Sequence, residues 1–116
     1  MNHDEWVEQV KVCEWLRQCH PDLPFYAINN ERKCTPMQAE RLRRSGRKSG
    51  IFDLFFPRGN KERSGLWIDM KTENGKPSVV QSYFAKEMRR EGYDAEFAYG
   101  AEEAINLIAL FYGLPR

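Results

Sequence analysis

Two aspartates and a lysine interrupt stretches of the sequence that are otherwise apolar. Asp53 lies within the run 50–56, and Asp69 lies within the run 66–71, two residues before Lys71. Residues two apart in a strand point to the same face, so Asp69 and Lys71 should project side by side. If the two runs pair as a hairpin, Asp53 lies close to Asp69. The spacing therefore predicts two carboxylates and one ammonium group gathered on a sheet.

Such a group of charges has a recognisable chemistry. Two close carboxylates repel each other unless a cation lies between them, and a hard divalent ion with oxygen ligands, Mg²⁺ first, resolves that conflict. Lys71 could orient or deprotonate a water, or stabilise charge on a phosphate. The set suits metal-assisted hydrolysis of a phosphodiester. The alternative is structural: Asp53 ends a strand at a turn, and Asp69 and Lys71 form an exposed pair.

A third acidic ligand would come from the beginning of the chain. Glu5 and Glu8 are three residues apart on a predicted helix and face the same way, with Gln9 four residues after Glu5. Glu5 could instead simply stabilise the N-terminus of the helix electrostatically. Both glutamates are candidates on spacing alone.

Hydrophobic periodicity and capping residues predict the elements that position these side chains. Helices are expected at about 3–19, 35–46, 78–91 and 101–112, and strands at 25–28, 50–56, 66–71 and 94–99. The order is α-β-α-β-β-α-β-α, an α/β protein with one domain over residues 1–116. Trp6, Trp15 and Trp67 fit the apolar periodicities and are expected in the core.

The net charge of +1 conceals an uneven distribution. Residues 1–30 carry a net charge of −3 and residues 91–116 a net charge of −4, whereas residues 31–50, hereafter the basic segment, carry seven basic and two acidic side chains. The basic side chains of this segment are Arg32, Lys33, Arg41, Arg43, Arg44, Arg47 and Lys48. Such a segment can neutralise phosphates, although a solvated helix face would look the same.

Composition excludes several classes of protein. With 41% hydrophobic and 13% aromatic residues, the chain is too apolar for a disordered tail. No apolar run approaches the length that spans a bilayer, and residues 1–5 do not resemble a secretory signal, so no membrane partner is expected. Cys13, Cys19 and Cys34 are an odd number without CxxC spacing, which disfavours a disulfide framework and a zinc cluster. A cytoplasmic location is therefore expected.

Three motifs together resemble a known nuclease family. They are Gly-x-x-Asp at 50–53, Asp-x-Lys at 69–71 and Ser-x-x-Gln at 78–81, and the similarity extends over nearly the whole chain. At these separations the sequence resembles the virus-type replication-repair nuclease (VRR-NUC) domain, a branch of the PD-(D/E)XK superfamily, in its stand-alone phage or bacterial type. Phe52 stands where the family usually has proline, and Asp69 stands where it usually has glutamate.

The resemblance implies a fold and an activity. The expected fold is a restriction-endonuclease-like core, a central mixed β-sheet flanked by helices. The expected activity is a Mg²⁺- or Mn²⁺-dependent endonuclease acting on branched or structured DNA, as in homodimeric resolvases of four-way (Holliday) junctions, in the cytoplasm of a bacterial or phage-infected cell. A nuclease of the same fold acting on flaps or duplex DNA, and a non-catalytic DNA-binding module, are the alternatives.

The resemblance also implies roles for individual residues. The metal ligands would be Asp53, Asp69, the backbone carbonyl of Met70, and Glu5, which precedes Gln9 by the family's spacing. Lys71 would lie beside the attacking water, and Gln81 would support the site or the scissile phosphate. The expected DNA contacts are Asn30, Arg32, Lys33, Arg44, Arg47, Lys48 and Ser78.

A homodimer is expected for a further reason. Two symmetry-related strands of a junction are naturally cut by a two-fold dimer. The predicted closing helix, 101–112, carries more apolar residues than one buried face requires, so it could form the interface or complete the core.

Overall fold

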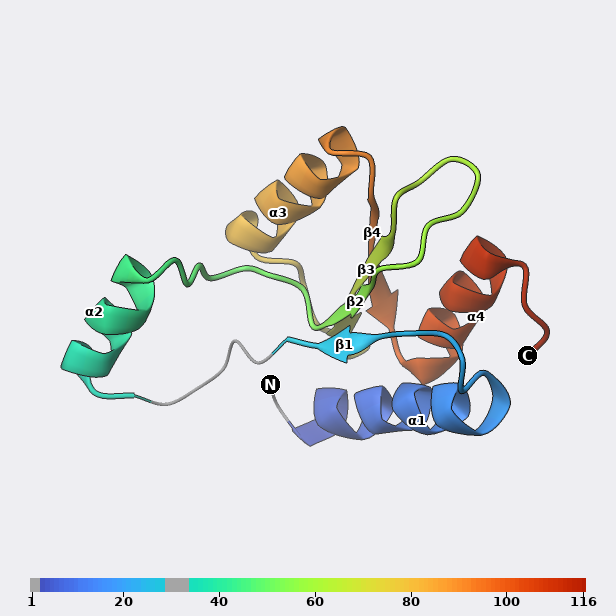
Figure 1. Ribbon diagram of the computed structural model, residues 1–116. Coiled ribbons are helices and arrows are strands. Elements are labelled where there is room, and N and C mark those ends of the chain that lie inside the picture. Colours follow the sequence, from blue (N-terminus) through green and yellow to red (C-terminus); the bar gives the residue numbers. More distant parts are fainter. Residues whose placement is uncertain (1–2, 29–33) are drawn as a thin grey trace.

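The computed structural model describes residues 3–28 and 34–116. In this part of the chain the helices are α1 (His3–Cys19), α2 (Pro36–Arg44), α3 (Val79–Arg90) and α4 (Ala101–Tyr112). The strands are β1 (Tyr26–Ala27), β2 (Leu54–Phe56), β3 (Leu66–Lys71) and β4 (Asp94–Tyr99) (Figure 1). Their order along the chain is the predicted one. None of the described helices combines the length and the apolar character needed to cross a membrane.

The four strands form one mixed sheet in the order β1-β2-β3-β4. The pairs β1–β2 and β2–β3 are antiparallel, whereas β3 and β4 run parallel. Parallel neighbours need a crossover connection, and α3 provides it. The sheet therefore combines a hairpin at its centre with a βαβ unit at one edge.

Helices cover both faces of the sheet (Figure 1). Helices α1 and α4 pack against each other and against β3 on one face, and α3 covers β4 on the other face. Strand β3 alternates accordingly: Leu66, Ile68 and Met70 are buried in the core beneath α1 and α4. Because side chains alternate along a strand, Asp69 and Lys71 point to the face that α3 covers.

The predicted strand 50–56 is wrong in its first half, because β2 begins only at Leu54. Gly50 has a φ of +84°, and a Cβ at this position would lie 2.9 Å from atoms of Val80, so the backbone packs directly on the start of α3. Phe52 is fully buried, with its ring centroid 5.2 Å from that of Phe84 and 4.8 Å from that of Phe97. The segment 50–53 thus anchors α3 rather than extending the sheet.

Helix α2 stands apart from the rest of the protein (Figure 1). It makes no close backbone contact with any other described helix or strand, and none of its residues is buried. A capping box stabilises its start: the Gln38 N–H donates to the Thr35 hydroxyl, and the Thr35 N–H donates to the Gln38 side chain. The middle of the basic segment is therefore a solvated, self-capped helix.

Candidate active site

The antiparallel pairing of β2 and β3 brings Asp53 to Asp69. Leu54 pairs with Ile68, so Asp53 lies opposite the next residue of β3, just before β2 begins. One carboxylate oxygen of Asp53, Oδ2, accepts a hydrogen bond of 2.8 Å from the backbone N–H of Met70. The Asp53 side chain therefore takes the place of a ladder hydrogen bond, and this fixes its carboxylate at the edge of β3.

Lys71 is held between the sheet and α3. Its ammonium nitrogen lies 3.2 Å from Oδ2 of Asp69 and donates a hydrogen bond of 2.8 Å to Oε1 of Gln81. The same Gln81 oxygen accepts the N–H of Ser78 at 3.0 Å, in the capping box that begins α3. Folding of the helix cap therefore positions Gln81, and Gln81 orients the lysine.

Both aspartates are in an environment that opposes their ionisation. Burial raises the pKa of Asp53 to about 7, and the negative charge of Asp69 adds to the rise. Burial also raises the pKa of Asp69, while Lys71 opposes that rise. Asp69 is only 2% exposed, and within the described part of the protein its Oδ2 has the ion pair of 3.2 Å with Lys71 but accepts no hydrogen bond. The single charge of Lys71 therefore does not fully compensate the two carboxylates.

These donors fit a hard divalent cation. A buried carboxylate oxygen without a hydrogen bond, beside a second carboxylate, is the oxygen-rich, negative environment that Mg²⁺ favours. The N–H and C=O of one strand residue point to the same side, so the Met70 carbonyl faces the gap from which its N–H reaches Asp53. Among residues 3–28 and 34–116, no three histidine, cysteine or acidic side chains converge at ligand distance. A complete ligand set therefore needs this carbonyl or a movement of a third carboxylate.

The two candidate glutamates of α1 have different surroundings. Partial burial raises the pKa of Glu5, with Lys71 lowering it and Asp53 raising it further, so Glu5 lies within electrostatic reach of the site. Glu8 instead accepts a hydrogen bond of 3.0 Å from the N–H of Ala101 and forms an ion pair of 2.7 Å with Lys11. Glu8 thus caps α4, which has no capping side chain of its own.

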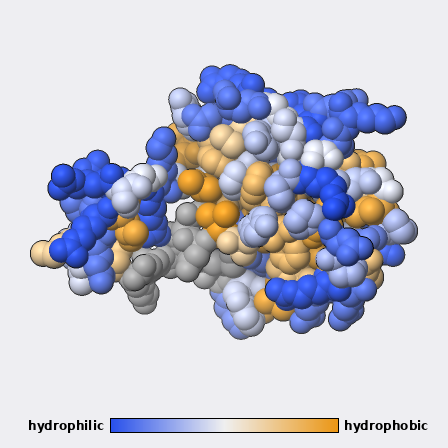
Figure 2. Space-filling view, in the orientation of Figure 1, coloured by the Kyte–Doolittle hydropathy of each residue, from blue (hydrophilic) through white to orange (hydrophobic). Residues whose placement is uncertain are grey.

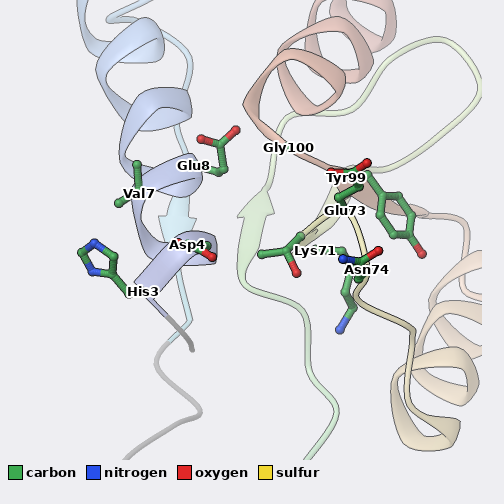
Figure 3. A pocket seen from close by; sticks show the side chains of 10 residues that line it. His3, Asp4, Val7, Glu8, Lys71, Glu73, Asn74, Tyr99 and Gly100 are labelled. Carbon is green, nitrogen blue, oxygen red and sulfur yellow. The ribbon is translucent and has the colours of Figure 1, made fainter.

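A cavity of about 760 Å³ lies beside the site, between the start of α1 and the ends of β3 and β4. Asp4 and Glu8 line one side of it, and Glu73, Asn74 and Tyr99 line the other (Figure 3). The cavity extends to Lys71, so solvent space meets the site from this direction. Glu73 and Asn74 are not among the predicted site residues, although they follow Asp-x-Lys closely in the sequence.

The expected DNA contacts are distributed differently. Asn30, Arg32 and Lys33 lie outside the described residues. Arg44 ends α2, away from the sheet, and is exposed, as is Lys48, whereas Arg47 is half-buried. Ser78 is occupied as the cap of α3. The structure therefore gathers Asp53, Asp69, Lys71 and Gln81 at one place but leaves the described basic residues on a separate surface.

Comparison with known proteins supports the fold. No family model matches the chain, and no curated protein matches it. A solved structure described as a VRR_NUC domain protein is similar to the chain with a TM-score of 0.79 and 23% identity, covering 98% of this chain and 91% of that one. The chain therefore has the α/β fold of that protein, a mixed sheet flanked by helices. This confirms the predicted fold class, and it confirms the VRR-NUC resemblance at the level of the fold.

Proposed function

We propose that the protein is a nuclease that uses Mg²⁺ or Mn²⁺ to hydrolyse phosphodiester bonds in DNA. The observation that carries this proposal is the buried pair Asp53–Asp69, with Lys71 held beside it by Gln81. A buried like-charged pair is costly to the fold, so a purely structural role explains it poorly. The shared fold of a VRR_NUC domain protein supports the same conclusion.

Each residue of the site has a proposed task. Asp53, Asp69 and the Met70 carbonyl would hold the ion, and Glu5 would complete the ligand set. The bound ion supplies Lewis-acid stabilisation of charge on the phosphate and lowers the pKa of a water. Lys71 offers its positive charge to the attacking water or to the phosphate oxygens. Gln81 keeps the ammonium group in that position by accepting its hydrogen bond.

The proposed substrate is branched DNA, in particular a four-way junction, cut by a homodimer. The exposed basic side chains of α2 and of Lys48 would supply a surface for phosphates at a distance from the carboxylates. A dimer would supply two sites for two strands. Most apolar residues of α4 pack in the core, where Ile105 and Ile108 are buried. Leu110 is 83% exposed and is therefore available for a dimer contact.

A panel of DNA substrates tests this function. We expect the protein to cut a four-way junction on two opposed strands in Mg²⁺ or Mn²⁺, and to cut nothing in EDTA. Faster cutting of a flap or a linear duplex than of the junction would contradict the proposed junction substrate. It would still be consistent with a nuclease. Salt-dependent binding without cutting of any substrate would contradict the nuclease. Sedimentation at micromolar concentration tests the dimer, which a monomer mass would contradict.

Replacing Glu5 and Glu8 separately shows which of the two is the third metal ligand. We expect Glu5→Gln to raise the Mg²⁺ concentration for half-maximal cutting at least about tenfold, because a charged ligand is lost. The matched variant Glu8→Gln should leave that concentration unchanged and lower the free energy of unfolding by about 0.5–1 kcal/mol, because the N-terminus of α4 loses the negative charge beside it. The reverse pattern would assign the metal to Glu8.

A further inference from the structure

An apolar groove of about 430 Å³ lies between residues 48–51 and α3. Its walls include Val79, Val80 and Tyr83, whose side chains are 87%, 49% and 62% exposed. Figure 2 shows hydrophobic residues gathered over the start of α3, on the side that faces α2. An aromatic ring and two valines exposed together cost solvation free energy, so the groove resembles a binding surface more than an ordinary helix face.

A second groove, of about 300 Å³, continues from the first. It is lined by Ala39, Arg43, Arg47, Lys48 and Ser49. Lys48 and Ser49 line both grooves, so a basic surface and an apolar surface meet at these two residues. The apolar groove carries one acidic residue, Glu87, whereas the basic groove carries none. Arg43 forms an ion pair of 2.6 Å with Glu40 of the same helix. Negative charge on a ligand would therefore lie on the part of the basic groove that carries Arg47 and Lys48.

The apolar groove is directly attached to the candidate active site. Val79 and Val80 lie between the capping Ser78 and Gln81, which binds Lys71. Ser49 and Ile51 line the other wall, and the chain reaches Asp53 two residues after Ile51. A ligand in the groove would thus touch both segments that hold the site.

We propose that the apolar groove binds an unpaired nucleobase, while the adjoining phosphates of the same DNA strand lie in the basic groove. A nucleotide has these two parts, an anionic phosphate and a flat apolar base. The exposed ring of Tyr83 offers a stacking surface, as aromatic side chains do in proteins that bind single strands. The inference rests on the proposed function, because it takes DNA as the substrate.

The groove would also explain a preference for branched DNA. Bases within an intact duplex are stacked on both faces and cannot reach Tyr83. A base at a branch point or a single-stranded end is cheaper to expose, because it has lost stacking or pairing. The groove would therefore select DNA by the presence of an exposable base, beside the residues that cut it.

Fluorescence of 2-aminopurine tests the proposal without cleavage. A labelled single-stranded oligonucleotide and a four-way junction labelled at the branch point are titrated with protein in EDTA. The affinity for a linear duplex is measured by its competition with the labelled single strand. We expect wild type and Tyr83→Phe to quench the labelled base. Tyr83→Leu should lose the quenching and bind the single strand roughly tenfold more weakly, with duplex affinity unchanged. Tyr26→Leu, which removes a ring of similar exposure (59%) on β1, should behave as wild type.

Two results would overturn the groove. The first is a folded Tyr83→Leu protein, shown by an unchanged melting temperature, that binds the single strand as tightly as wild type. The second is a Tyr83→Leu protein that changes oligomeric state without DNA and keeps the quenching, because the groove would then be an interface between copies. Cutting by a protein that fails this test would overturn the groove alone. Quenching by a protein that never cuts would support the groove and overturn the nuclease.

Discussion

Lys71→Met should lower the rate of DNA cleavage by about 10²- to 10³-fold and leave DNA affinity nearly unchanged. Losing one preorganised charge beside a developing phosphate charge costs about this much. Binding should persist because Lys71 is only 8% exposed and its ammonium group contacts Asp69 and Gln81. Cleavage and affinity are measured on the same labelled junction, with and without Mg²⁺. Methionine keeps the length of the side chain, so the change isolates the charge.

A matched lysine controls for a general loss of positive charge. Lys86 is exposed on α3, the same helix that carries Gln81. Lys86→Met should cut DNA at the wild-type rate. Cleavage by Lys71→Met at the wild-type rate would show that Lys71 has no role in the mechanism. A comparable loss of cleavage in both variants would attribute the effect to net charge rather than to the site.

Asp53→Asn should make the metal-free protein more stable at pH 8 while abolishing cleavage. Asp53 has a pKa of about 7 in the folded protein and an ordinary value of 3.8. Between these two values the folded protein holds a proton that the unfolded chain has released, so the free energy of unfolding falls as pH rises from about 4 to 7. An amide removes this penalty, which is roughly 1–4 kcal/mol above pH 7. Urea unfolding in EDTA at pH 5 and pH 8 measures it.

The effect of Mg²⁺ on stability should distinguish Asp53 from Glu96, a second carboxylate with a similar pKa. Burial also raises the pKa of Glu96 to about 7, with Asp94 adding to the rise, on β4 away from the site. Mg²⁺ should stabilise wild type and Glu96→Gln at pH 8 but not Asp53→Asn, because Asp53 is expected to be a metal ligand and Glu96 is not. A metal-free Asp53→Asn protein that is less stable than wild type at pH 8 would refute the proposed penalty.

Much of the site follows from spacing in the sequence. The two-residue period of strands places Asp69 and Lys71 on one face, and the hairpin pairing brings in Asp53. The capping motif from Ser78 to Gln81 fixes a side chain at the first turn of α3. These are local rules of the backbone, so they apply before any tertiary contact is known. The limits of β2 depend instead on the packing of Gly50 against α3, which spacing does not reveal.

Helix α1 shows where periodicity is ambiguous. Trp6 was predicted in the core, but its side chain is 56% exposed. The buried face runs through Val12 and Leu16, and helical spacing extends this face to Gln9 and Glu5. Apolar residues also occupy the flanks of the helix, so the sequence alone does not reveal which stripe faces the sheet. Once the sheet is known, the same spacing turns Glu5 toward the site.

The apolar groove beside α3 is likewise not predictable from hydrophobic periodicity. Helix α3 has apolar residues on both sides, with Phe84 packed against the core and Val79, Val80 and Tyr83 exposed. A hydrophobic pattern does not distinguish a residue that completes the core from one that serves a ligand. Only the three-dimensional arrangement shows that these residues are exposed beside Lys48, at the border of two grooves.

The isolation of α2 has a consequence for how such a protein can change over generations. No residue of this helix is buried, and it shares no close backbone contact with the other described helices and strands. Substitutions at such positions usually alter stability by no more than about 0.5 kcal/mol. Its arginines can therefore be exchanged or redistributed while the carboxylate pair and its supporting cap remain intact. Selection can therefore change the residues on the surface of α2 without affecting how the rest of the protein folds.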